Sequence, residues 1–366
     1  MSIVFIAGTT AELIKVSPVM RELEARGVPF RLWSTSQHVT GVEESLTDLQ
    51  VRSPDVYLIA AGQRAHIAAS RQVPGWALRL LRTVLRYRRR LKAKLKGGGG
   101  RGVVVVHGDT FTTVIGSLIG RFFGAEVAHV EAGLRSGSIL SPLPEELNRR
   151  IVGRIATIHF APTQREVENL RRAHAPGEYV LTGANTVVDA LRSVDASAAE
   201  DVALPEHFGL VTLHRFELLR DGEHFAELLG LLAEASADHP LVIVLGQAEK
   251  ARMAELGLDQ LLCDTFTSID KRPYARFLPI LARADFVVTD SGGLQEECAA
   301  LGVPCAVHRE RTERHQGLGE NVVLTGMDLD RLRVFLRDWR AHRRPAPVLA
   351  ESPSAIIADR LAHLRA

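Results

Sequence analysis

A glycine-containing turn is the segment of this chain best suited to bind a charged ligand. Residues 290–293 include two glycines, follow the apolar run 286–288 and lead into a helical pattern. Glycine lets a backbone approach a ligand closely, and the first turn of a helix presents free N–H groups to an anion. Glu297 lies one turn into that helix, where its carboxylate could accept hydrogen bonds from ribose hydroxyls. The turn therefore suits a nucleotide diphosphate.

Three side chains at the ends of predicted strands could transfer protons. Asp109 follows an apolar run and precedes a helix start, so taken alone it fits a helix cap better than an acid or base. Glu131 directly follows residues 127–130, and a carboxylate in that position needs a partner or a ligand. His214 ends another strand, where an imidazole is placed for proton transfer or phosphate contact.

Further charged residues extend this set. Glu145 and Glu146 follow two prolines, and acids in a first helical turn complement the helix dipole. Stabilisation of the helix N-terminus is enough to explain both glutamates. The functional interpretation adds that one of these two carboxylates faces the ligand. Arg215 and Arg314 could bind phosphate in fork geometry, although a single arginine is more often structural.

The elements that carry these residues alternate between strands and helices. Strands are predicted at 3–7, 30–33, 103–106, 126–130, 210–213, 241–245, 286–289 and 304–307. Helices are predicted at 11–26, 112–123, 225–235, 274–284, 294–301 and 355–364. Such alternation predicts an α/β protein with parallel, doubly wound sheets, whose ligands bind beyond the carboxyl ends of the strands. Two such units would leave an interdomain cleft, a common location for small-molecule sites.

Length and pattern predict more than one domain in these 366 residues. We expect a Rossmann-like domain at 1–192 that carries most of the catalytic carboxylates. A second Rossmann-like domain, at 193–352, would bind the nucleotide. The remaining residues, 353–366, are predicted to form a helix that packs back on the first domain.

Composition restricts the partners and the compartment. A net charge of +2 gives no reason to expect a nucleic-acid partner. Three cysteines without metal-ligand spacing favour a reducing cytosol. We find neither a signal-like leader nor an apolar run long enough to span a bilayer, so we expect a cytoplasmic protein without membrane partners.

One segment, residues 76–96, is strongly basic. Leucines at positions 78, 81 and 85 keep roughly helical spacing within it. The segment could be a patch that faces nucleic acid or a membrane. We favour an amphipathic helix with a solvated basic face, because a charge run without a motif is weak evidence for a partner.

Taken together, the chain resembles the non-hydrolysing UDP-N-acetylglucosamine 2-epimerases, which have the two-domain fold called GT-B. The matching segments occur in the family's order at 8–18, 37–38, 107–110, 129–137, 141–149, 159–163, 182–187, 212–217, 274–277, 290–297 and 309–314. The resemblance implies reversible C2 epimerisation of UDP-GlcNAc to UDP-ManNAc, by elimination of UDP to a 2-acetamidoglucal intermediate and re-addition. It also implies a UDP-sugar substrate, a homodimer, and no metal or redox cofactor.

The resemblance assigns roles to individual residues. Proton transfer on two faces of a sugar requires at least two acid/base groups. By resemblance, the catalytic residues are Asp109, Glu131, Glu145 and His214. The residues that bind the nucleotide sugar are Lys15, Arg135, Arg215, Phe277, Ser291, Gly292, Gly293, Glu297 and Arg314. Within this set, the serine and glycines form the phosphate turn, Glu297 contacts the ribose and Phe277 the uracil.

The chain departs from the family in its first loop. Thr10 and Ala11 stand where the family has arginine and proline, and Phe216 is a second departure. A lost charged phosphate contact could cost roughly 1.5–3 kcal/mol unless another group replaces it. The departures leave open another nucleotide or a modified sugar in a specialised glycoside pathway. A hydrolysing epimerase, a GT-B glycosyltransferase and a non-catalytic sugar-nucleotide binder are further alternatives.

A third departure concerns regulation. The family's His-Asn-Pro motif is replaced by residues 245–247, although the Gln37-His38 pair of its allosteric site is present. We therefore expect allosteric activation by UDP-GlcNAc to be weakened or absent.

Overall fold

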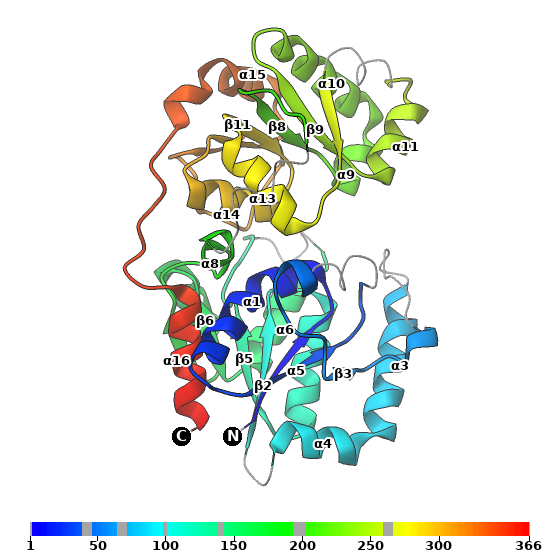
Figure 1. Cartoon of the computed structure of the whole chain (residues 1–366), viewed down its shortest axis with the longest axis vertical. Coiled ribbons are helices and arrows are strands. Elements are labelled where there is room, and N and C mark those ends of the chain that lie inside the picture. The colour runs from blue at the N-terminus through cyan, green and yellow to red at the C-terminus, as the bar shows by residue number, and fades with distance from the viewer. Residues whose placement is uncertain are drawn as a thin grey trace. The chain divides into compact units, whose positions relative to one another are not determined.

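Two compact units make up the chain in this computed structural model (Figure 1). Unit 1 comprises Met1–Ser193 and Leu349–Ala366, and unit 2 comprises Val194–Val348. The structure describes residues 2–38, 46–63, 72–97, 101–137, 143–192, 202–258 and 266–365. The domain boundaries predicted from the sequence, at 1–192, 193–352 and 353–366, stay a prediction.

Unit 1 is built on a sheet of seven parallel strands in the order β3-β2-β1-β4-β5-β6-β7. The strands are β1 (Ser2–Ala7), β2 (Phe30–Ser34), β3 (Val56–Tyr57), β4 (Gly102–His107), β5 (Glu126–Val130), β6 (Ile158–Ala161) and β7 (Glu178–Leu181). Strand β4 is buried throughout, as expected of a β-branched run covered on both faces. The strand order reverses between β1 and β4, which makes that edge a topological switch point.

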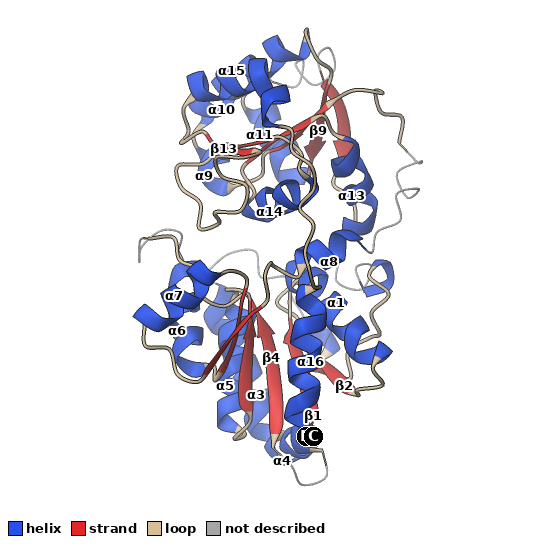
Figure 2. Cartoon of the chain, turned by 90° about the vertical axis from the view of Figure 1, so that its left-hand side faces the viewer, coloured by secondary structure: helices blue, strands red, loops and turns tan. Residues whose placement is uncertain are grey.

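Helices cover both faces of this sheet (Figure 2). They are α1 (Thr10–Ala25), α3 (Val73–Arg86), α4 (Arg88–Lys96), α5 (Phe111–Phe122), α6 (Glu145–Ile155), α7 (Gln164–Arg172), α8 (Val187–Arg192) and α16 (Pro353–Arg365), with a short 3-10 turn at Ala61–Gln63. A capping box between Thr9 and Glu12 starts α1. The last helix, α16, packs beside α1, and Arg26 Nε lies 2.8 Å from Asp359 Oδ1.

Unit 2 repeats the same plan with six parallel strands in the order β10-β9-β8-β11-β12-β13. Its strands are β8 (Gly209–Thr212), β9 (Leu241–Leu245), β10 (Phe266–Asp270), β11 (Phe286–Thr289), β12 (Cys305–Val307) and β13 (Val322–Leu324). Its helices are α9 (Phe216–Arg220), α10 (Gly222–Ser236), α11 (Gln247–Glu255), α13 (Tyr274–Arg283), α14 (Gly292–Leu301) and α15 (Leu329–Asp338), with a 3-10 helix at Trp339–His342. The switch point lies between β8 and β11. The predicted α/β class with two doubly wound units is confirmed.

The basic segment differs from its prediction. It forms two helices, α3 and α4, instead of one, and the predicted apolar stripe faces solvent. Trp76, Leu80 and Val84 are the buried side chains of α3, whereas Leu78 is 47% exposed. Helix α3 carries two apolar stripes, and the one with the largest side chain enters the core, where the Trp76 indole donates a hydrogen bond to Thr35 O at 3.0 Å.

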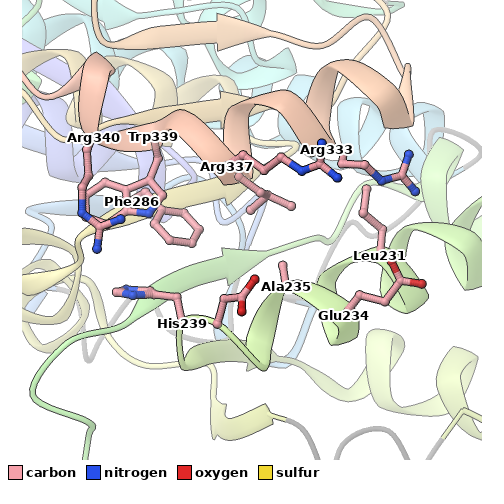
Figure 3. A pocket seen from close by; sticks show the side chains of 11 residues that line it. Leu231, Glu234, Ala235, His239, Phe286, Arg333, Arg337, Trp339 and Arg340 are labelled. Carbon is pink, nitrogen blue, oxygen red and sulfur yellow. The ribbon is translucent and has the colours of Figure 1, made fainter.

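A cavity of about 380 Å³ in unit 2 contains none of the predicted site residues (Figure 3). Glu234 and His239 line one side of it, and Arg337 and Trp339 the other. Its lining includes the first residue of β11 and residues just before β9, so it lies at the amino ends of the strands. Ligands of doubly wound sheets bind at the opposite ends. In the part of the chain that the structure describes, no helix is long and apolar enough to cross a membrane.

Candidate active site

Glu131 is the most constrained of the predicted catalytic residues. It follows β5 with a φ of 64°, a left-handed conformation that non-glycine residues rarely adopt and that is often retained for function. Its Oε2 lies 2.5 Å from the ammonium of Lys15 and also accepts a hydrogen bond from the amide of Asn185. His107 Nε2 lies 3.6 Å from the same oxygen. Because a neighbouring ammonium favours an ionised carboxylate, this environment suits a general base.

Asp109 follows β4, next to Glu131 across the sheet. The cap of α5 is Thr110, whose side chain accepts a hydrogen bond from Thr113 N, so the cap interpretation of Asp109 is wrong. The Asp109 carboxylate instead pairs with Arg149 of α6. Asn148 Nδ2 fixes the same residue by donating a 2.8 Å hydrogen bond to its carbonyl oxygen. Helix α6 therefore orients this carboxylate.

The two adjacent glutamates at the start of α6, Glu145 and Glu146, have different surroundings. Glu146 is fully buried and accepts hydrogen bonds from Ser136 N at 3.2 Å and from Arg150 Nε at 2.9 Å. It also lies 3.4 Å from Arg149 Nη1. Glu146 therefore joins α6 to the loop after β5, and the half-buried Glu145 remains the candidate for chemistry.

A buried carboxylate joins the loops at the switch point of unit 1. Glu12 accepts hydrogen bonds from the backbone N–H groups of Gly8 and Thr9, at 2.8 and 2.9 Å, and from Thr110 Oγ1 at 2.5 Å. Burial raises the pKa of Glu12 although these hydrogen bonds oppose the rise. The loop after β1 is thus fastened to the loop that carries Asp109.

His129, on β5, supports the same edge as a neutral side chain. Its Nε2 lies 2.7 Å from Gly108 O, the carbonyl of the residue before Asp109. Burial lowers the pKa of His129 to about 3, although the Gly108 carbonyl favours the charged ring. His129 is therefore a structural support for the loop and not a proton carrier at neutral pH.

In unit 2, His214 and Asp290 form a pair beyond the ends of β8 and β11. His214 Nδ1 lies 3.1 Å from Asp290 Oδ1. Asp290 Oδ2 accepts the backbone N–H groups of His214 and Arg215, at 2.8 and 2.7 Å. Burial raises the pKa of Asp290, but the hydrogen bond and charge of His214 with these N–H groups outweigh burial and hold it below its ordinary value. The pair fixes the ring through Nδ1 and leaves Nε2 for a ligand.

Three arginines lie near the N-terminus of α14, and two of them, Arg309 and Arg314, also pair with Glu313. Ser291 caps this helix by accepting a hydrogen bond from Leu294 N. A Cβ at Gly292 would lie 2.8 Å from Arg314 Nη1, 3.2 Å from Glu313 Oε1 and 3.3 Å from Arg309 Nη1, so these side-chain ends lie directly against the turn. A third guanidinium group, that of Arg215, lies close by, and its Nε donates a hydrogen bond to Asp290 O at 2.9 Å. Free N–H groups and several arginines together form an anion site.

The remaining predicted residues divide between the two units. Glu297 is buried on α14, where its charge, together with burial as the larger cause, raises the pKa of Tyr274. Phe277 is half-buried on α13. Arg135 lies in unit 1, where Nη1 donates to Leu134 O at 2.7 Å and burial lowers its pKa. Lys15 contacts Glu131, and its predicted contact with the nucleotide stays a prediction.

Sequence reasoning missed four supporting residues, namely Asn185, Arg149, Asp290 and Arg309. All four lie in segments that matched the family, which was the available signal. In the described residues, no group of three or more His, Cys, Asp or Glu side chains could hold a metal ion.

Two doubly wound units, one with clustered carboxylates and one with an anion site, define a two-domain α/β enzyme. A family model for UDP-N-acetylglucosamine 2-epimerase matches residues 100–339. The UDP-N-acetylglucosamine 2-epimerase of Salmonella typhimurium is 32% identical over 91% of this chain and 88% of that protein. Its Yersinia pestis counterpart is 31% identical over the same shares.

A solved structure agrees. The crystal structure of Methanocaldococcus jannaschii UDP-GlcNAc 2-epimerase in complex with UDP-GlcNAc and UDP is 26% identical, with a TM-score of 0.79 over 99% of this chain and 100% of that chain. This chain therefore belongs to the UDP-N-acetylglucosamine 2-epimerase family and is an isomerase, as the sequence predicted.

Proposed function

We propose that this chain interconverts UDP-GlcNAc and UDP-ManNAc by eliminating UDP and adding it back. The supporting observation is the buried Lys15–Glu131 pair, which holds a carboxylate against an ammonium at the end of β5, the strand next to the one that leads to Asp109. Loss of the C2 proton requires such a base, and its return to the opposite face requires a second acid. Family membership makes this the first reaction to test.

Unit 2 holds the nucleotide in this proposal. The diphosphate binds at the N-terminus of α14, behind the cap residue Ser291, where Gly292 and Gly293 offer backbone N–H groups and Arg309 and Arg314 supply charge. The Glu297 carboxylate accepts hydrogen bonds from the ribose hydroxyls, and the Phe277 ring lies against the uracil. His214, oriented by Asp290, contacts the departing diphosphate and offsets its growing negative charge.

Unit 1 moves the protons. A carboxylate among Asp109, Glu131 and Glu145 removes the proton at C2 while the C1–O bond to UDP breaks, which gives the 2-acetamidoglucal. UDP then re-adds at C1, and an acid from the same group returns a proton to the other face of C2. Arg149 and Lys15 hold two of these carboxylates in place.

The first loop favours a second candidate, the same chemistry on another sugar nucleotide. Thr10 is half-buried and Ala11 exposed in the first turn of α1, where the family has its arginine and proline. Neither side chain can supply a charged phosphate contact. A panel of sugar nucleotides decides between the candidates, because equal or better turnover of a donor other than UDP-GlcNAc would favour the second.

Product analysis tests the proposal. Ion-exchange chromatography after incubation with UDP-GlcNAc should show UDP-ManNAc and no free sugar. Free ManNAc with UDP would instead identify a hydrolysing epimerase. The cytoplasmic location, expected from the cysteine content and the absence of a leader-like segment, and the homodimer, implied by the family resemblance, remain part of the proposal.

A further inference from the structure

The loop between β12 and β13 carries two of the arginines at the anion site, Arg309 and Arg314. Both guanidinium groups lie within 3.3 Å of the position that a Cβ of Gly292 would take. Residues 310–316, all of which the structure describes, form no helix or strand. The position of Arg314 beside the turn therefore depends mainly on contacts made by side chains.

The side chain of Gln295 fastens this loop to α14. It is 0% exposed and lies one turn into the helix, where its backbone N–H donates to Ser291 O at 3.1 Å. Its Nε2 donates hydrogen bonds to Arg314 O at 3.1 Å and to Gln316 O at 3.3 Å. Its Oε1 accepts a hydrogen bond from Thr312 Oγ1 at 2.7 Å. Because carbonyl oxygens can only accept hydrogen bonds, they fix which end of the amide faces the loop.

Thr312 extends this contact to the backbone N–H of Arg314. Its hydroxyl donates to Gln295 and accepts the Arg314 N–H at 3.2 Å. Since Gln295 also binds the Arg314 carbonyl, both polar backbone groups of Arg314 belong to one small network. The guanidinium group is held separately, because its Nε lies 3.0 Å from Oε2 of Glu296 on α14. The main chain and the side chain of Arg314 are therefore both fastened to α14.

We propose that Gln295 is a positioning residue for the contact between Arg314 and the phosphates. This inference rests on the nucleotide site proposed above at the N-terminus of α14. Gln295 does not touch the ligand: it sets the position of Arg314 relative to the N–H groups of Gly292 and Gly293. Donors that are already in place need no reorganisation when an anion binds. Loss of the Gln295 amide should therefore weaken the binding of a diphosphate.

A second buried amide in unit 2 offers a matched control. Asn321 is 2% exposed, and its Nδ2 donates hydrogen bonds to Cys298 O and Val303 O, both at 2.8 Å. These contacts lie in the last turn of α14 and beyond it, at the opposite end from the anion site. Loss of either amide leaves two carbonyl oxygens without their donor and should lower stability. Only the loss of Gln295 should also change the affinity for a diphosphate.

Calorimetric titration of the purified full chain with UDP and with inorganic pyrophosphate tests the proposal. Gln295→Met keeps the length of the side chain but loses its hydrogen bonds, and it should raise the Kd of both ligands about tenfold. Asn321→Leu should lose a similar amount of thermal stability and bind both ligands like the wild type. Pyrophosphate separates this proposal from the proposed function, because it reports on the anion site whether or not UDP is the ligand.

A double-mutant cycle shows whether Gln295 acts through Arg314. Arg314→Gln removes the guanidinium charge, keeps a donor for Glu296, and should raise the Kd of pyrophosphate about 100-fold. Adding Gln295→Met to Arg314→Gln should raise the Kd by no more than about twofold, because the group that Gln295 positions is already gone.

A milder pair of variants carries the test if Gln295→Met does not fold. Thr312→Val removes the hydroxyl that links Gln295 to the Arg314 N–H and should weaken the binding of both ligands. Thr312→Ser restores a hydroxyl and should bind them nearly as tightly as the wild type. Equal affinities in the two Thr312 variants would contradict the proposed link.

The remaining outcomes decide the proposal as follows. An unchanged Kd in Gln295→Met, or equal losses of affinity in Gln295→Met and Asn321→Leu, would overturn it. Additive effects of Gln295→Met and Arg314→Gln would also overturn it, because Gln295 would then not act through Arg314. Pyrophosphate binding that Gln295→Met weakens, in a protein that does not bind UDP, would support the positioning role and contradict only the nucleotide assignment. A wild-type protein that binds neither ligand would overturn both.

Discussion

Asp290 holds His214 from two directions, through a 3.1 Å contact with the ring nitrogen and a 2.8 Å hydrogen bond from the backbone N–H. The carboxylate belongs to the end of β11 and the histidine to the end of β8, the two strands that flank the switch point of unit 2. The topology of the sheet therefore creates a positioned imidazole beside the anion site. Neither strand alone would orient the ring.

Replacing Asp290 should impair turnover more than binding. Asp290→Asn keeps the shape of the side chain but loses the charge, so the ring loses its fixed orientation and tautomer and activity should fall by about 100-fold or more. Steady-state kinetics should show the loss in kcat, with a smaller change in KM. Asp285→Asn is the matched control, because Asp285 also contacts histidine, 3.1 Å from His239 Nε2, but lies just before β11. Equal losses in both variants would contradict the positioning role.

Lys15 should act through Glu131 and not through the nucleotide. Lys15→Met leaves a buried carboxylate without its closest cation, which typically costs about 3 to 5 kcal/mol of stability. Turnover should fall, whereas UDP binding measured by calorimetry should stay close to the wild-type value. Adding Glu131→Gln should recover stability but not turnover. A large loss of UDP affinity in Lys15→Met would instead support the nucleotide contact that the family resemblance predicts for Lys15.

The adjacent residues Glu145 and Glu146 should fail in different ways. Glu146→Gln removes the negative charge of a fully buried side chain that joins Ser136, Arg149 and Arg150. The loss of these charged hydrogen bonds should lower the temperature of thermal unfolding. Glu145→Gln should leave the unfolding temperature unchanged and reduce turnover by about 100-fold or more, as expected for loss of an acid/base group. If both variants lose only stability, Glu145 is not a catalytic residue.

Acid should destabilise the fold in part through His129. Burial lowers its pKa to about 3, whereas the ordinary value is 6.5. Between these values the unfolded chain binds more protons than the folded one, so stability falls as the pH drops below 6.5.

A substitution isolates this contribution. In His129→Gln the loss of stability between about pH 6.5 and about pH 5 should be smaller by about 2 kcal/mol than in the wild type, as measured by urea unfolding. The control is His174→Gln, which removes an exposed histidine from the same unit and should behave like the wild type. Equal pH dependence in His129→Gln and the wild type would mean that His129 is not the group that titrates.

Local sequence patterns predicted the strands and helices but not the side-chain contacts of the candidate catalytic residues. Strands such as β5 and β11 were predicted with their observed limits, because apolar β-branched runs and glycine turns are local signals. The partners of the catalytic candidates come from distant positions, Asn185 for Glu131 and Arg149 for Asp109. Only the order of the strands in the sheet brings these residues together.

The sequence did not show which apolar stripe of α3 is buried, for a different reason. Spacing alone cannot distinguish two apolar stripes on one helix, since both satisfy the helical period. Trp76, 0% exposed, decides the packing because its ring fills the core while its N–H reaches a backbone carbonyl. Hence Leu81, with equally good spacing, is left at the surface.

Proton NMR in deuterated water tests the central claim most directly. The purified protein is incubated with UDP-GlcNAc and no coupling enzyme, and the C2 position of the sugar is followed. We predict that deuterium enters at C2 while UDP-ManNAc accumulates, because the proton removed by a carboxylate exchanges with solvent before its return. UDP-ManNAc that keeps its original C2 proton, or no exchange and no product, would contradict the account.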